Sequence, residues 1–140
     1  MATSNWFAQA SSDIFKLAAE AEQRAGSNPG KEFFSTMVDL KILANLALYH
    51  ARRIPAGLSY ALFAQTQDLN ALDDAIQNEK RAIEAWDAIV GAAGEVYSSD
   101  LMMGLAEFDL SGHWKDELAK LKSGLAALEQ IGRASCRERV

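Results

Sequence analysis

The stretch that decides the fold is residues 68–97, DLNALDDAIQNEKRAIEAWDAIVGAAGEVY. Its large apolar residues recur at steps of three, four and seven: Leu69, Leu72, Ile76, Ile83, Trp86, Val90 and Tyr97. Side chains at this spacing share one face of an α-helix, and only Glu79 interrupts that face. The pattern predicts an amphipathic helix about 43 Å long, at ~1.5 Å per residue, on which the rest of the chain packs.

Two helices are predicted over residues 6–53. Residues 6–25 form the first, which ends before Gly26 because glycine is favoured directly after a helix. Its inward face consists of Phe7, Ala10, Ile14, Leu17 and Ala21. Residues 31–53 form the second, with Asn28 as the N-cap and Pro29 at the first helical position. Apolar residues on two faces of this second helix predict that it lies between two neighbours.

Pro55 lacks a backbone N–H, so we expect the second helix to end or kink there. Residues 56–67 then form a separate third helix, and Asp68 caps the long helix that follows. Gly57, Tyr60, Asp68, Ala71 and Leu72 occupy the places that a tetratricopeptide helix pair would need. The resemblance covers one repeat without a second copy at the ~34-residue period, so it indicates an antiparallel helix pair and not a repeat array.

The chain after the long helix is predicted to be irregular and then helical. Residues 101–110 are too apolar for an ordinary solvated loop and should cover part of the core. Residues 113–130 form the last helix, capped by Ser111. The expected fold is therefore all-α, a single antiparallel bundle of four to six helices that includes the tetratricopeptide-like pair.

Length and composition agree with one globular domain. The chain has 140 residues, of which 49% are apolar and two are proline, and this composition argues against disorder. It contains no run of 18 apolar residues, which predicts a soluble protein without a membrane span. The first residues, MATSNWFAQASSD, show no signal peptide, and the compartment stays open.

The last ten residues, IGRASCRERV, differ in composition from the rest of the chain. All ten positions resemble the translation of a common sequencing adapter, read in frame to its stop codon. This resemblance implies a helical module over residues 1–130, a non-native tail over residues 131–140, and a native polypeptide interrupted near Gln130. A natural basic tail is the alternative.

The proposed tail affects the charge and the cysteine count. Cys136 is the one cysteine of the chain, so residues 1–130 have no thiol for a disulfide, a nucleophile or a metal. Removing three arginines and one glutamate from the 14 basic and 19 acidic side chains leaves 11 and 18, a formal charge of −7. An acidic surface repels phosphate, so we expect no nucleic-acid partner.

Motifs for the common chemistries are missing from the sequence. A di-metal helical bundle needs Glu-x-x-His pairs, but Ala47 and Leu110 stand three residues before His50 and His113. No glycine-rich phosphate loop and no nucleophile elbow occur. We therefore predict no metal, no cofactor and no catalytic residue. Glu79 is the unusual carboxylate, and a buried ion pair with Lys41, Arg52 or Arg53 would explain it.

The best candidate site consists of Tyr97, Asp109, His113, Trp114 and Asp116. An aromatic ring of Tyr97 or Trp114 could stack on the apolar face of a sugar, while Asp109 or His113 bonds its hydroxyls. In the alternative interpretation Trp114 belongs to the core, Asp109 caps a turn and His113 begins a helix at the surface. The apolar residues 101–110 could also be a docking surface for a neighbouring domain.

Several short segments between Glu32 and Glu129 carry a resemblance to a known group of proteins. They are Phe33-Phe34-Ser35-Thr36 with Asp39, Tyr49-His50-Ala51, Leu62-Phe63 with Thr66 and Asp68, Glu84-Ala85-Trp86 and Gly112-His113-Trp114-Lys115-Asp116-Glu117-Leu118. Together they resemble helical segments near the C-termini of large bacterial glycan-degrading proteins, glycoside-hydrolase-like ones in particular. The resemblance implies that the chemistry lies in a barrel domain outside this chain.

These observations favour a non-catalytic helical accessory module, a fragment of a larger bacterial carbohydrate-active enzyme, whose partner is the neighbouring domain or another protein. Two alternatives stay open. The chain could be a stand-alone helical interaction module, or it could carry part of a carbohydrate-binding or hydrolysing site around His113 and Trp114.

Overall fold

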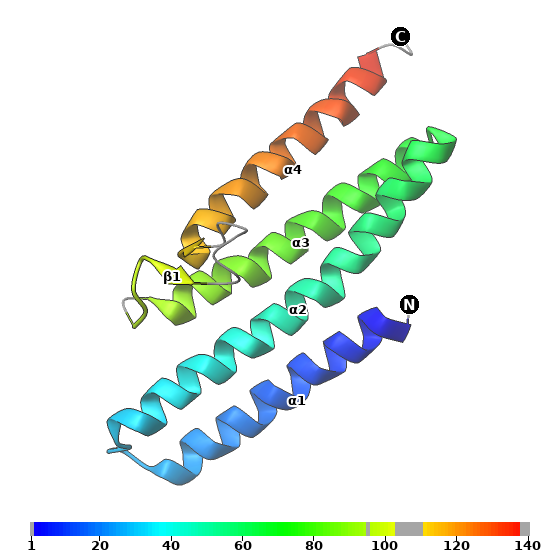
Figure 1. Ribbon diagram of the computed structural model, residues 1–140. Helices are drawn as coiled ribbons and strands as arrows, with labels where there is room; N and C mark the ends of the chain where they lie inside the picture. The colour runs from blue at the N-terminus through cyan, green and yellow to red at the C-terminus, as the bar shows by residue number, and fades with distance from the viewer. Residues whose placement is uncertain (1, 95, 103–110, 138–140) are drawn as a thin grey trace.

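The structure is a computed structural model that describes residues 2–94, 96–102 and 111–137. These residues form four helices, α1 (Ala2–Ala25), α2 (Lys31–Thr66), α3 (Leu69–Ala93) and α4 (Trp114–Arg137) (Figure 1). Two short strands, β1 (Leu101–Met102) and β2 (Ser111–Gly112), pair antiparallel before α4. The predicted all-α class with antiparallel neighbours is confirmed.

The helices pack in chain order. α1 lies against α2, α2 against α3, and α3 against α4, and these are the substantial helix contacts among the described residues. Figure 1 shows α1 and α4 on opposite sides of the α2–α3 pair. The arrangement is therefore an open row with two inner helices, in which the two outer helices do not close a ring.

α3 supplies the wall on which its neighbours pack, as the sequence predicted. Leu72, Ala82, Ile89 and Ala93 are fully buried along it. Alanines face the neighbouring helices at several turns, so the helices can approach closely. The helix is about 37 Å long, at ~1.5 Å for each of its 25 residues. It ends at Ala93, before the predicted Tyr97, because Gly94 caps it with a φ of 45°.

The separation of α2 into two helices at Pro55 was wrong. α2 runs without interruption from Lys31 to Thr66 with Pro55 inside it. A proline removes the hydrogen bond to the carbonyl four residues earlier, which here is that of Ala51. The Ser4 hydroxyl of α1 donates to this carbonyl at 2.7 Å. The neighbouring helix thus replaces the bond that the proline cannot make, and the segment 56–67 continues α2.

Three other predictions about the first half of the chain need correction. α1 begins at Ala2, and the residues that it buries against α2 are Ser4, Ser11 and Ala18. This heptad-spaced row turns Leu17, which was expected inside, to 63% exposure. α2 begins after Gly30, whose extended backbone is the N-cap, so the predicted cap at Asn28 is wrong. Gly26 ends α1 with a φ of 74°, as expected.

Of the two helix caps predicted in the second half of the chain, one is confirmed and one is wrong. Asp68 caps α3 as predicted, because its side chain accepts from the backbone N–H of Asn70 at 2.9 Å. Ser111 does not cap α4, since it lies in β2. α4 continues seven residues past Gln130 to Arg137, so the helix shows no break at the predicted 130/131 boundary. The adapter origin of the tail stays a prediction. None of the described helices has the length and hydropathy to span a membrane.

Candidate functional site

The residues predicted to hold a sugar come together at the N-terminal end of α4. The rings of Tyr97 and Trp114 meet edge to face with centroids 5.1 Å apart, and those of His113 and Trp114 with centroids 5.6 Å apart. The indole N–H of Trp86 donates to the Trp114 carbonyl at 2.9 Å, which ties this cluster to α3. Asp109 lies outside the described residues. The structure thus brings four of the five predicted residues into one region.

The polar groups of this cluster serve the local structure. The backbone N–H of His113 donates to Asp116 Oδ2 at 2.9 Å, and the N–H of Lys115 donates to His113 Nδ1 at 3.2 Å. This is the reciprocal pattern of a capping box, with a histidine in the cap position. The Tyr97 hydroxyl donates to Asp39 of α2. His113 is 5% exposed, so the alternative of a surface histidine is wrong.

A small hollow of about 290 Å³ lies beside the cluster. It is lined by Val90, Gly94, Tyr97, Ser99, His113 and Lys115. His113 Nδ1 and Asp116 Oδ2 already bond to backbone groups, so these two atoms serve the start of α4, while Ser99 and Lys115 add polar side chains to the hollow. The contacts of this cluster hold the start of α4 against α3. A carbohydrate site at the cluster stays a prediction.

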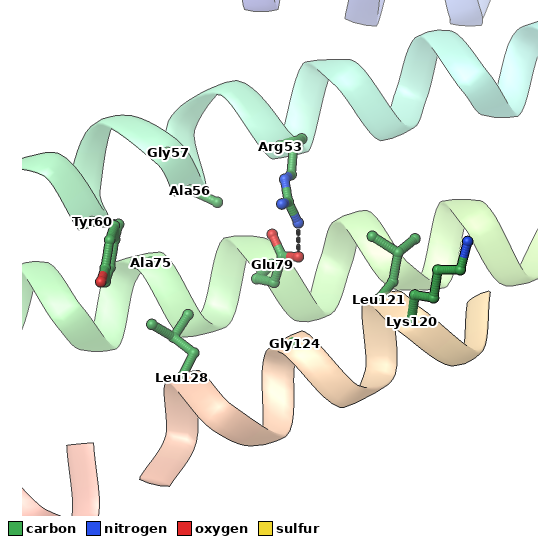
Figure 2. A pocket seen from close by; sticks show the side chains of 10 residues that line it. All are labelled: Arg53, Ala56, Gly57, Tyr60, Ala75, Glu79, Lys120, Leu121, Gly124 and Leu128. Atoms are coloured by element: carbon green, nitrogen blue, oxygen red, sulfur yellow. Dashed lines mark hydrogen bonds and ion pairs between the residues drawn. The ribbon is translucent and has the colours of Figure 1, made fainter. Parts of the chain in front are cut away.

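A second depression lies over the middle of α3, where α2 and α4 leave a groove between them (Figure 2). Its volume is about 340 Å³. The lining residues are Arg53, Ala56, Gly57, Tyr60, Ala75, Glu79, Lys120, Leu121, Gly124 and Leu128. α3 forms its floor, and most of the wall is apolar or small. A cluster of Phe63, Leu72, Ile76, Leu125 and Leu128 packs at one end of it.

Glu79 stands on the floor of this groove and is 7% exposed. Its Oε1 is paired with the guanidinium of Arg53 in α2. Of the three partners that the sequence left open, the structure selects Arg53, while Arg52 pairs with Glu84 and Lys41 with Glu22. The predicted buried ion pair is confirmed. It explains why a carboxylate can interrupt the apolar face of α3 without an uncompensated charge.

Sequence reasoning singled out Glu79 but missed the groove around it. The groove depends on which turns of α2 and α4 meet over α3, and the periodicity of each helix alone does not specify this. The available signal was Gly57 and Gly124, since glycine in a helix interior is unfavourable by about 1 kcal/mol relative to alanine. Both lie inside helices and line the groove.

Neither site has the composition of a metal centre. Among the described residues, no three side chains of histidine, cysteine, aspartate or glutamate are placed to share an ion. The ring of His50 packs against Phe7 and Tyr49 at centroid distances of 5.2 and 5.3 Å. His50 therefore has an aromatic environment within the α1–α2 interface.

Comparison with known proteins gives no further information about either site. No family model, no curated protein and no solved structure matches the chain. The resemblance to helical segments of glycan-degrading proteins therefore remains an expectation from the sequence.

Proposed function

We propose that this chain is a non-catalytic helical module that packs against another polypeptide. The observation that carries the proposal is the end of α2 beyond α1. α1 covers one face of α2 as far as Ser4, which bonds Ala51. On the turns that follow, Leu58 and Leu62 are 55% and 50% exposed.

These two leucines continue the face that α1 covers further back. Ala44, Ala47 and Ala51 are buried on that face, and steps of three or four residues lead from Ala51 to Leu58 and Leu62. Along this face of α2, covered alanines are followed by exposed leucines. The exposed leucines form a surface on which a further helix could pack. Contiguous apolar surface of this kind is typical of protein contacts.

The resemblance of residues 32–129 indicates what this polypeptide is. We expect it to be the catalytic part of a bacterial carbohydrate-active enzyme, with this chain as its accessory module. The use of His113 and Asp116 in a helix cap supports a non-catalytic role. A stand-alone interaction module would use the same surface on a separate protein.

The first test is enzymatic. The purified chain, incubated with a panel of nitrophenyl glycosides, should release no nitrophenol above buffer. A variant His113→Ala serves as the control for the predicted sugar site. Turnover by the natural chain that this variant loses would contradict the proposal and favour a glycosidase site.

The second test concerns the partner. The genomic reading frame that contains this chain should encode a catalytic domain for glycans, and that domain, expressed separately, should bind the chain. The double variant Leu58→Ser, Leu62→Ser should weaken this binding at least tenfold. Leu43→Ser is the matched control, because Leu43 is also an exposed leucine of α2, at 52%, but lies within the half that α1 accompanies. Equal binding by both variants would contradict the proposed surface.

A further inference from the structure

The groove between α2 and α4 has a property that the docking surface lacks, namely a buried polar anchor. The side chain of Glu79 is 9% exposed and lies on the groove floor (Figure 2). Arg53 pairs with its Oε1, and Oε2 has no partner in the described part of the chain. No fully buried side-chain oxygen or nitrogen of the described residues lacks a partner, so Oε2 keeps contact with solvent, and Glu79 is one of the residues that line the groove. Glu79 therefore brings a hydrogen-bond acceptor without a partner among the described residues to the lining of a largely apolar groove.

The charges around this acceptor restrict the ligand. Glu79 is balanced by Arg53, and Lys120 in the α4 wall is paired with Glu117 at 2.6 Å. A ligand cation would approach Glu79 but also the guanidinium beside it, and a ligand anion would meet the carboxylate. A neutral group that both donates and accepts avoids either repulsion. Arg53 is 45% exposed and carries five N–H donors, so it can bond a ligand oxygen as well as Glu79.

The walls suit an apolar body of modest size. Ala56, Ala75, Leu121 and Leu128 line the groove, and about 340 Å³ falls within the range of pockets for small molecules. Gly57 and Gly124 stand in opposite walls, and a Cβ added at either would meet no atom within 4 Å. Packing inside the chain therefore does not require these two glycines, and their missing side chains widen the groove.

We propose that this groove binds a small neutral molecule that carries an amide on an apolar body. The amide N–H donates to Glu79 Oε2, and its carbonyl accepts from Arg53. The apolar body lies between Gly57 and Gly124. This binding is independent of the proposed docking surface, which lies on another face of α2.

The test compares three probes with the same benzyl body and different charge, 2-phenylacetamide, phenylacetate and 2-phenylethylamine. Each is titrated into the full chain, and the backbone amide signals of Gly57 and Gly124 are followed by NMR. 2-Phenylacetamide should shift both signals and saturate with a dissociation constant on the order of 1 mM, as expected for so small a ligand. The anion and the amine should bind at least tenfold more weakly.

Two sets of variants locate the binding. Glu79→Gln retains the shape and an acceptor for Arg53 but replaces the free acceptor by a donor, so affinity for 2-phenylacetamide should fall at least fivefold. Glu129 forms an ion pair with Lys80 outside the groove, so the control variant Glu129→Gln should leave the affinity for 2-phenylacetamide unchanged. Gly57→Ala with Gly124→Ala should raise the Tm and lower the affinity. Gly91→Ala, at a helical glycine with equally open surroundings outside the groove, should raise the Tm alone.

Three results would overturn the proposal. The first is binding of the anion or the amine that equals or exceeds that of the amide. The second is unchanged affinity in Glu79→Gln. The third is a shift of the Gly57 and Gly124 signals with protein concentration in the absence of a probe, which would show that a second copy of the chain fills the groove.

Discussion

The two halves of α2 lie against the same α3 but differ in what covers their other side. In the first half α1 covers that side, and Ala44, Ala47 and Ala51 are at most 8% exposed there. In the second half α1 has ended, and Leu58 and Leu62 are about half exposed. Pro55 stands at the change, with Ser4 bonded to the carbonyl that it leaves free.

This difference teaches that hydrophobicity and burial do not run in parallel along α2. Next to the junction the covered half has small side chains, Ala44, Ala47 and Ala51, which allow close approach of α1, and the bare half has two exposed leucines, Leu58 and Leu62. On the face of α2 that packs against α3, the exposed fraction is low in both halves, since Val38 in the first half is 7% exposed and Phe63 in the second half is 6% exposed. The second half of α2 is thus a well-anchored helix with one free face.

The largest expected effect separates the two faces of that second half. Phe63 and Leu62 are neighbours in sequence, but Phe63 packs against Leu72 and Ile76 while Leu62 is half exposed. We expect Phe63→Ala to lower the free energy of unfolding by about 3–5 kcal/mol, the usual range for a buried aromatic residue. Leu62→Ala should change it by less than about 0.5 kcal/mol. Urea titrations followed by circular dichroism measure both, and equal losses would contradict the assignment of faces.

The next effect concerns the junction of the two halves. Ser4→Ala leaves the Ala51 carbonyl without its donor, since Pro55 cannot replace it. The free energy of unfolding should fall by about 1–3 kcal/mol. The exposed Ser12→Ala in the same helix should have almost no effect.

A double-mutant cycle separates the contribution of the hydrogen bond between Ser4 and the Ala51 carbonyl from other effects of removing the Ser4 hydroxyl. Pro55→Ala restores a backbone N–H to α2, so Ser4→Ala in that background should be almost neutral. If Ser4→Ala is as harmful in the Pro55→Ala background as in the natural chain, the hydroxyl does not compensate for the proline.

The free face itself should contribute little to stability and much to surface hydrophobicity. Leu58→Ser with Leu62→Ser should keep the free energy of unfolding within about 0.5 kcal/mol. Binding of the dye 1-anilinonaphthalene-8-sulfonate to the native chain should fall, and the control Leu43→Ser should lower it less. A large loss of stability would show that these leucines already have a partner.

The smallest effect lies at the far end of the row, where α4 meets α3. Lys80 lowers the pKa of Glu129 below its usual value of 4.5, through a hydrogen bond first and through its charge second, with a lesser contribution from Arg133. A carboxyl group with a lowered pKa stabilises the fold above its unfolded pKa, and this contribution is lost as the pH falls through the folded pKa. Lys80→Met should return the pKa of Glu129 toward 4.5 in a carbon-detected NMR titration. An unchanged pKa would show that α4 does not hold Glu129 near Lys80.

Much of the fold could be predicted from the sequence, and the failures have physical reasons. The long helix after Asp68, its cap and its apolar face follow from local spacing and local hydrogen bonds. The predicted break at Pro55 failed because the compensating hydroxyl comes from Ser4, 47 residues before the Ala51 carbonyl that it bonds. Leu17 was placed inside because large apolar side chains suggest a core, whereas α1 packs through serines and alanine.

For the two sites too, the sequence predicted what depends on local spacing and did not predict what depends on helix packing. Glu79 was recognisable because a carboxylate broke an apolar pattern, but only the packing of three helices reveals that it lines a groove. The rings of Tyr97 and His113 meet that of Trp114, and His113 bonds Asp116, but the sugar site predicted from these residues stays a prediction. Their mutual contacts and the cap that they form depend on how α4 begins, which the spacing did not specify.

The open row of helices is tested most directly by electron paramagnetic resonance distances between spin labels. One label pair joins Leu17→Cys in α1 to Ala119→Cys in α4, and a reference pair joins Leu17→Cys to Leu43→Cys in the neighbouring α2, all in a Cys136→Ser background. We expect the α1–α4 distance to exceed the reference by about two helix spacings, roughly 18 Å at ~9 Å each. An α1–α4 distance equal to the reference would mean a closed four-helix bundle and would contradict the free face of α2.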